Sequence, residues 1–240
     1  MNTPERSINL TSVSHLLFDL DHTLWDCSAN SVASLRKIFA DNGFASSFSS
    51  FDEFNNNFQR INDELWAALP NNSHMTVDYV RRERFVRTLK MVNINDEDLF
   101  DKVDHDYMIL MSRAPKSMPN AHEVLSKLSL KYEIDIVSNG VADVQESKLR
   151  SCGLDVFVKK LFISDKVGAM KPQREYFDHV LKELGCGPDE CLMIGDNPET
   201  DIKGAQDCGI QSIWYNSRHM DVDIDAIEIK DLKELLTLLP

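Results

Sequence analysis

The 240-residue chain has 42% hydrophobic residues and a formal net charge of −13. This composition can fill a buried core, whereas the acidity disfavours a nucleic-acid polymer or an anionic membrane surface as the main partner. The five cysteines form no C-x-x-C pair, and no apolar run approaches the roughly 20 residues of a membrane-spanning helix. We therefore expect a cytoplasmic protein with free thiols and no membrane segment.

In chain order, residues 15–18 (HLLF) predict a short buried strand, and residues 26–112 then have a helical texture with few glycines. Within that block, apolar residues at 51, 54, 58, 61 and 65 follow the steps of an amphipathic helix, which Pro70-Asn71-Asn72-Ser73 should end. Further helices are expected over 28–40, 77–90 and 96–111.

From residue 113 onward, strand and helix patterns alternate, which is typical of a parallel sheet covered by helices. The expected strands are 134–137, 161–164, 191–194 and 212–215, and the expected helices are 121–129, 143–151, 173–184 and 201–208. The sequence thus predicts an α/β fold: a Rossmann-like parallel-sheet core (1–25 and 113–240), with helices on both faces, and an inserted all-helical cap (26–112).

Asp19 and Asp21 follow the first strand directly. Residues two apart on a strand point to the same side, so both carboxylates are expected at the carboxyl edge of the sheet, where open α/β sheets bind ligands. One carboxylate can attack phosphorus while the other handles the proton, provided that a divalent cation and a fixed positive side chain cancel the repulsion between anions. Lys171 and Asp196 are the candidates. Alone, Asp-x-Asp-x-Thr is more often a strand end followed by a turn with a helix cap.

Four segments in this order resemble the motifs of the haloacid dehalogenase-like superfamily over nearly the whole chain. They are Phe18 to Leu24 (FDLDHTL), Ile136 to Gly140 (IVSNG), Gly168 to Pro172 (GAMKP) and Ile194 to Asp201 (IGDNPETD). The resemblance implies a phosphatase rather than a dehalogenase, because dehalogenases of this superfamily lack an acid at the position of Asp21.

The same resemblance implies a role for each motif residue. Asp19 would be the nucleophile that forms an aspartyl-phosphate, and Asp21 the general acid and then base. Thr23, Ser138 and the backbone N–H of Asn139 would contact the substrate phosphate, and Lys171 would neutralise its charge. Mg²⁺ would be held by Asp19, by the backbone carbonyl of Asp21 and by Asp196. Asp201 would either begin its helix as a first-turn acid or orient Asp196 or Lys171.

The helical block and motifs resemble the pyrimidine 5'-nucleotidase branch, which implies a nucleoside monophosphate as the small-molecule phosphate monoester. A sugar-phosphate or phosphoglycolate-type phosphatase, or a non-catalytic nucleotide-binding protein, remains an alternative. Trp25 or Trp66 could stack on a base, although packing is the commoner use of such residues. The arginines of the segment 81–87 could reach the substrate, but a solvated helix face with a Glu83–Arg87 pair is favoured. His22 is expected to be structural.

Overall fold

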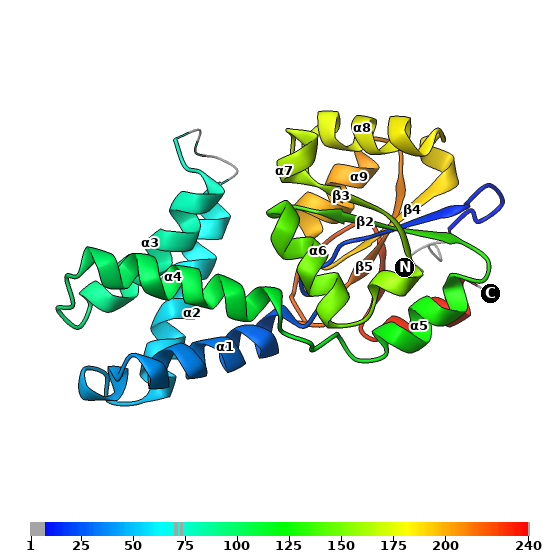
Figure 1. The fold of residues 1–240 in the computed structure, drawn as a ribbon. Helices are drawn as coiled ribbons and strands as arrows, with labels where there is room; N and C mark the ends of the chain where they lie inside the picture. Colours follow the sequence, from blue (N-terminus) through cyan, green and yellow to red (C-terminus); the bar gives the residue numbers. More distant parts are fainter. Residues whose placement is uncertain (1–7, 70–71, 73, 240) are drawn as a thin grey trace. The chain divides into compact units, whose positions relative to one another are not determined.

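The computed structural model describes residues 8–69, 72 and 74–239. These residues form two compact units, one of residues 8–27 and 115–239 and the other of the described residues between 28 and 114. Figure 1 shows the first unit as a sheet with helices and the second as helices. Within the described residues, no helix is long and apolar enough to cross a membrane.

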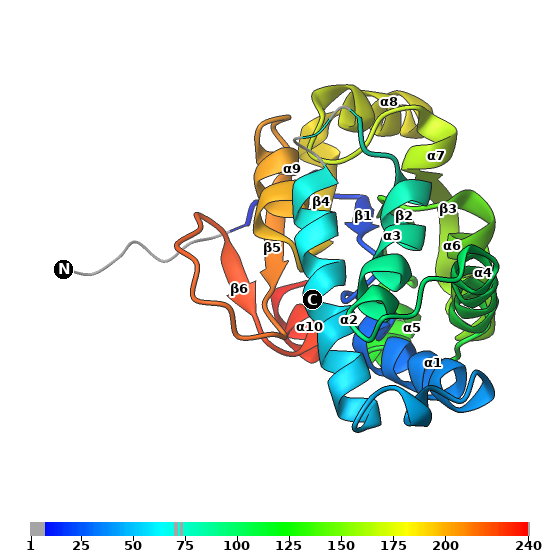
Figure 2. The same ribbon diagram turned by 90° about the vertical axis from the view of Figure 1, so that its left-hand side faces the viewer.

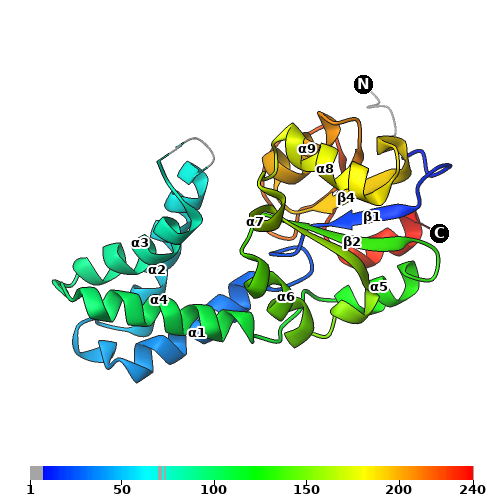
Figure 3. The ribbon, with the colours of Figure 1, turned by 45° about the horizontal axis from the view of Figure 1, so that its top comes forward.

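The first unit contains one six-stranded sheet in which every pair of neighbouring strands is parallel. The strand order is β3-β2-β1-β4-β5-β6, and Figure 3 shows β1 between β2 and β4. This confirms the predicted α/β parallel-sheet fold. The strands are β1 (His15–Phe18), β2 (Glu133–Ser138), β3 (Val158–Ile163), β4 (Cys191–Gly195), β5 (Gln211–Tyr215) and β6 (Ile227–Ile229).

Helices cover both faces of this sheet, as predicted. In Figures 1 and 3, α8 and α9 lie on one face and α5 and α6 on the other. Phe18 pairs in register with Ile136 and Ile194, so β1 is a central strand, and its apolar run is fully buried. The helices and helical turns of the unit are α5 (Ala121–Leu128), α6 (Ala142–Ser151), η3 (Asp155–Phe157), α7 (Ser164–Val167), α8 (Arg174–Leu184), η4 (Pro188–Glu190), η5 (Pro198–Lys203), α9 (Gly204–Gln206), η6 (Leu232–Glu234) and α10 (Leu235–Leu238).

Two elements of this unit have other bounds than expected, and one strand was missed. The helix expected over 201–208 begins earlier, as the π-helical turn η5, because Pro198 occupies its first turn and the Asn197 side chain accepts from the N–H groups of Glu199 and Thr200. The strand expected over 161–164 is β3, and Ser164 already begins α7. Strand β6, at the edge of the sheet in Figure 2, was not predicted because three residues carry too little pattern.

The second unit contains the helices expected from the periodicity. The side chain of Ser50 caps α2, whose apolar stripe of Phe54, Phe58, Ile61 and Leu65 is buried as predicted. Of the predicted break after this helix, residues 70, 71 and 73 lie outside the described residues. The elements are α1 (Cys27–Asp41), η1 (Phe44–Ser46), α2 (Phe51–Ala68), α3 (Val77–Lys90) and α4 (Glu97–Ser112).

The arginines of α3 are only partly a solvated face. Arg87 pairs with Glu83 at 2.8 Å, as predicted. Arg84 is buried, with 6% of its surface exposed, and its guanidinium lies 4.8 Å from the ring centre of Tyr107 and 5.3 Å from that of Phe58. The solvated-face prediction was therefore wrong for Arg84, because aromatic rings stabilise the buried cation.

All five cysteines are free thiols, as the sequence predicted. The Sγ atoms of Cys186 and Cys191 lie 3.4 Å apart beside β4. Burial raises the pKa of the Cys191 thiol well above its ordinary value, so this thiol is protonated at neutral pH.

Candidate active site

Three neighbouring strands bring acidic and polar side chains to one edge of the sheet. Asp19 follows β1, Ser138 ends β2 and Asp196 follows β4. Because β1 lies between β2 and β4, these residues meet at the point where the strand order reverses, the usual ligand position in such sheets. The backbone N–H of Asp19 donates to the Ile194 carbonyl at 2.9 Å, which ties the loop after β1 to β4.

Lys171 enters this edge from the loop between α7 and α8. Its Nζ donates to Asp19 Oδ1 at 2.8 Å, to Asp201 Oδ1 at 2.7 Å and to the Val137 carbonyl at 2.8 Å. The Asn139 side chain fixes the loop, since its Oδ1 accepts from the Lys171 N–H and its Nδ2 donates to the Lys171 carbonyl, both at 2.8 Å. The buried ammonium is thus held on three acceptors.

The charges of these buried groups act strongly on one another. Burial would lower the pKa of Lys171, but the carboxylates of Asp19 and Asp201 raise it well above its ordinary value, so this side chain is a permanent cation. Burial raises the pKa of Asp19, while Lys171 opposes the shift. Burial also raises the pKa of Asp196 well above its usual range, and the charges of Asp19 and Asp201 add to the effect. The charges of Arg218 and Lys171 oppose this shift.

Asp201, at the first turn of η5, has both carboxylate oxygens engaged. Oδ1 accepts from Lys171 and from Thr200 Oγ1, and Oδ2 accepts from the backbone N–H of Asn197 at 3.0 Å. The carboxylate therefore orients Lys171, one of the two roles expected from the sequence. A Cβ atom at residue 195 would lie 2.4 Å from Asp201 Oδ2, which explains why glycine ends β4.

The donor set fits a magnesium ion. Asp19, Asp196 and Asp201 each offer a carboxylate oxygen, and these oxygens lie within 4.8 Å of one another. All three residues are buried. Oxygen ligands that carry negative charge are the ligands that Mg²⁺ prefers. Because both carboxylate oxygens of Asp201 are engaged elsewhere, Asp19 and Asp196 would be the better ligands.

Asp21 lies near this group, but its carboxylate has other partners. Lys148 Nζ donates to its Oδ1 at 2.7 Å and to its Oδ2 at 3.0 Å, and Gln145 Nε2 donates to Oδ2 at 2.9 Å. Burial alone would raise the pKa of Asp21, but Lys148 and Gln145 outweigh burial and hold this pKa below its usual value.

The remaining predicted residues also lie at this edge. Thr23 is fully buried, and its Oγ1 has no hydrogen-bond partner among the described residues. Ser138 Oγ accepts from Gln145 Nε2 at 2.6 Å. His22 has a φ of 66°, and burial and the charge of Arg218 lower its pKa, so its ring is neutral. Trp25 is fully buried, which favours packing over base stacking.

Sequence reasoning missed three polar residues of the site. Gln145 and Lys148 lie on α6, and Arg218 follows β5 and donates to Asp196 Oδ2 at 2.5 Å. Gln145 and Lys148 are three residues apart on a helix that begins just after Ser138-Asn139-Gly140, so they share a face that could have been noticed. Nothing in the sequence marks Arg218, which reaches the site only through the course of the loop between β5 and β6.

The chain is similar in sequence and in fold to known proteins. The HAD-hydrolase YfnB of Bacillus subtilis is 30% identical over 228 residues, 93% of this chain and 94% of the relative. The crystal structure of YfnB bound to magnesium matches with a TM-score of 0.86, covering 95% of this chain and 99% of that one. Two pyrimidine 5'-nucleotidases are each 27% identical to this chain. The match to PynA of Streptococcus pneumoniae covers 93% of this chain and 94% of the relative, and the match to YjjG of Escherichia coli covers 86% of this chain and 87% of the relative.

A family model for the haloacid dehalogenase-like hydrolases matches residues 16–215. This span contains every side chain just described except Arg218. Because the model covers most of the chain and its sequence motifs meet at one buried edge of the sheet, the chain belongs to the haloacid dehalogenase-like hydrolases.

Proposed function

We propose that this protein is a magnesium-dependent phosphomonoesterase that works through an aspartyl-phosphate on Asp19. The observation that carries the proposal is the contact of Asp19 with Lys171 at 2.8 Å, within a group of three buried carboxylates. A carboxylate attacks a phosphate ester only where positive charge is already fixed beside both anions, and Lys171 supplies such a charge.

In the first step, an oxygen of Asp19 attacks phosphorus and the bond from phosphorus to the ester oxygen breaks. The carboxylate of Asp21 is ionised in the resting site, so it must take up a proton from water as the substrate binds. Asp21 then gives this proton to the ester oxygen, so that an alcohol rather than an alkoxide leaves. The Ser138 hydroxyl donates to a phosphoryl oxygen, and the hydroxyl of Thr23, which has no partner among the described residues, is proposed as a further donor. The three N–H groups of Lys171 are already engaged, so Lys171 stabilises the phosphoryl group through its charge. Such fixed donors suit a loose transition state, in which charge spreads over the phosphoryl oxygens.

In the second step, water attacks the phosphorus of the aspartyl-phosphate. Asp21, now ionised, takes a proton from this water, the bond between phosphorus and Asp19 breaks, and inorganic phosphate forms. Although burial alone would raise the pKa of Asp21, Lys148 and Gln145 hold it below its usual value, so its carboxylate is ionised in the resting site and can accept this proton. Lys171 again balances the charge of the Asp19 carboxylate as it is released.

Mg²⁺, held by Asp19, Asp196 and the backbone carbonyl of Asp21, would neutralise the carboxylates and polarise a phosphoryl oxygen. The acidic side-chain oxygens of this group support the assignment, as does the magnesium in the YfnB crystal structure.

A carboxylic acid at position 21 supports ester hydrolysis over dehalogenation, because a halide needs no proton when it leaves. The substrate class rests on the relatives: two of those that match most of this chain are named pyrimidine 5'-nucleotidases. We propose nucleoside monophosphates with a pyrimidine base as substrates.

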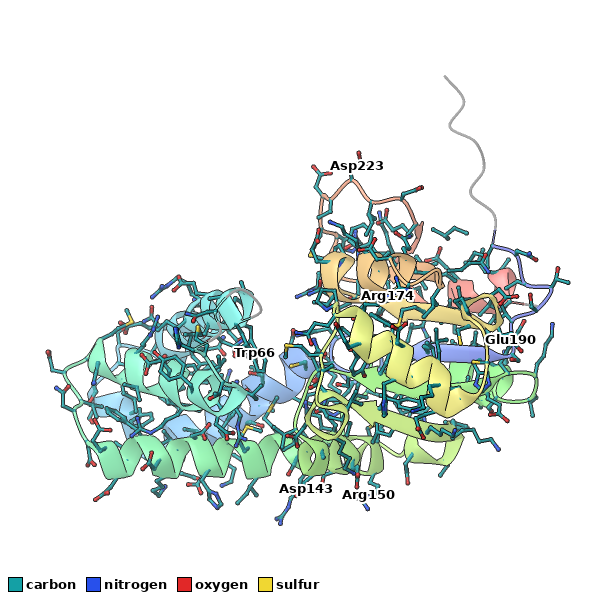
Figure 4. The ribbon with its side chains drawn as sticks, turned by 90° about the horizontal axis from the view of Figure 1, so that it is seen from above. Trp66, Asp143, Arg150, Arg174, Glu190 and Asp223 are labelled. Carbon is teal, nitrogen blue, oxygen red and sulfur yellow. The ribbon has the colours of Figure 1, made fainter. Side chains whose placement is uncertain are left out.

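The helical unit is proposed to act as a cap that selects the leaving group. The proposed insert, residues 26–112, begins shortly after strand β1 and Asp19. It includes Trp66 on α2, labelled in Figure 4, whose aromatic side chain is partly exposed and is the proposed candidate for stacking on a base.

The test is phosphate release from a panel of pyrimidine and purine nucleoside monophosphates and sugar phosphates, with Mg²⁺ and with chelator. We expect magnesium-dependent release with a preference for pyrimidine monophosphates, and none with Asp19→Asn. A preference for sugar phosphates would keep the chemistry and discard the nucleotidase assignment, while magnesium-independent release, or full activity of Asp19→Asn, would refute the mechanism.

A further inference from the structure

The carboxylate of Asp21 is clamped by two side chains of a single helix. Lys148 Nζ reaches both of its oxygens, at 2.7 and 3.0 Å, and Gln145 Nε2 reaches Oδ2 at 2.9 Å. An aspartate side chain has two rotatable bonds, and donors on both oxygens fix them together. The orientation of this carboxylate is therefore set by α6.

The two donors are themselves held in place. Gln145 is 1% exposed and Lys148 is 7% exposed, while Asp143 and Arg150 of the same helix are exposed and point outward in Figure 4. The ammonium of Lys148 also lies 4.5 Å from the ring centre of the buried Trp25, a cation–π contact. A lysine that serves only solubility would lie on the outer face of α6.

Gln145 connects the proton donor to the phosphate-binding side of the site. Its Nε2 donates both to Asp21 Oδ2 and to Ser138 Oγ, the latter at 2.6 Å. Because the Ser138 oxygen accepts this bond, its own O–H remains available for a phosphoryl oxygen. The amide also fills the space beside Gly140, where a Cβ atom would lie 2.8 Å from the Gln145 side chain.

From these contacts we propose that Lys148 and Gln145 are positioning residues, which hold the Asp21 carboxylate where it exchanges a proton with the ester oxygen. The proposal rests on the proposed phosphatase function. Neither residue touches the reacting atoms; both act through Asp21, and Gln145 also acts through Ser138. Proton transfer requires hydrogen-bond distance to the leaving oxygen, so a carboxylate free to rotate loses part of its effect.

Esters that differ in their need for the proton separate this role from a general loss of structure. An alkyl ester leaves as an alcohol and requires the acid, whereas p-nitrophenyl phosphate leaves as a stable phenolate and does not. In Lys148→Met the side-chain stem remains over Trp25 but the charge and the donors are gone. The measured quantity is kcat/KM for the best alkyl ester of the wild-type protein and for p-nitrophenyl phosphate, since kcat/KM covers the step in which the leaving group departs.

We expect Lys148→Met to lower kcat/KM for the alkyl ester by about tenfold to a hundredfold, because a general acid contributes ~10²–10⁴-fold and the variant loses part of this contribution. For the aryl ester, kcat/KM should fall by less than about threefold. Lys148→Arg should recover part of the loss. The matched control is Glu146→Gln, which breaks the exposed pair with Lys166 on the same helix and should leave both values unchanged. The ratio of kcat/KM for the alkyl ester to kcat/KM for the aryl ester does not depend on the fraction of the protein that is folded.

An equal loss on both esters, or no loss on either, would overturn the positioning role while the proposed phosphatase function stands. If Lys148→Met fails to fold, the same ratio measured on Gln145→Leu decides. A wild-type protein that hydrolyses neither ester would refute the phosphatase function, and the positioning role with it.

Discussion

Replacing Lys171 with methionine removes the cation that balances the buried carboxylates. The Lys171 side chain is 1% exposed, and its partners Asp201 and Asp19 are 2% and 10% exposed. Removing one partner of a buried ion pair costs about 3–5 kcal/mol, because the remaining charge stays buried without compensation. For a domain of this size each kcal/mol lowers Tm by about 2–4 °C, so we expect Lys171→Met to melt about 6–20 °C below the wild type in chelator.

The assay is thermal unfolding followed by circular dichroism, with and without Mg²⁺. Lys230→Met is the matched control, because Lys230 is exposed and pairs with Glu228 at 3.7 Å, and little change in Tm is expected there. The double variant Lys171→Met/Asp201→Asn should recover part of the loss, since it removes one of the uncompensated charges. A Tm of Lys171→Met within 2 °C of the control would refute the view that Lys171 holds this site together.

Three further outcomes follow from the same contacts. Gly195→Ala should destabilise the protein by about 1–3 kcal/mol, since the new Cβ would lie 2.4 Å from Asp201 Oδ2; an unchanged urea midpoint would contradict this. Mg²⁺ at a hundred times its Kd should stabilise the wild type by about 2.7 kcal/mol and raise its Tm. Asp196→Asn should lose most of this rise in Tm, and a rise as large as that of the wild type would show that Asp196 does not bind the metal. Because burial raises the pKa of Cys191, its thiol should resist iodoacetamide at pH 8 until the protein unfolds; rapid labelling, followed by peptide mass mapping, would contradict this.

The sequence predicted the parts of the fold that long patterns encode. The buried run of β1 was located because burial on both faces leaves a continuous apolar run, and the stripe of α2 because burial on one face leaves a helical period. The π-helical turn at Pro198 and the three-residue strand β6 depend on local hydrogen bonds and on the neighbouring strand, which leave no such period. Arg84 was misjudged for a related reason, since its aromatic neighbours come from three different helices.

The residues of the candidate site could likewise be predicted only where a short sequence pattern marks them. Short motifs beside strands were enough to group Asp19, Lys171 and Asp196, and the structure places these residues in one cluster. Arg218 could not, because a charged residue on a loop usually faces solvent, and only the course of the loop after β5 brings it inward. Lys148 shares a face of α6 with Gln145, a weak signal that was overlooked because a lysine on a helix usually faces solvent. The catalytic roles of all these residues remain predictions.

The most direct test of the central claim is to trap the phosphorylated enzyme. The protein is mixed with its best substrate and Mg²⁺, quenched in acid within one turnover and treated with borohydride, which reduces an aspartyl-phosphate to homoserine. Peptide mass spectrometry should then find homoserine at position 19 and nowhere else, and none without substrate. Phosphate release without any reduced residue, or reduction at Asp196 or Asp21 in place of Asp19, would contradict Asp19 as the nucleophile.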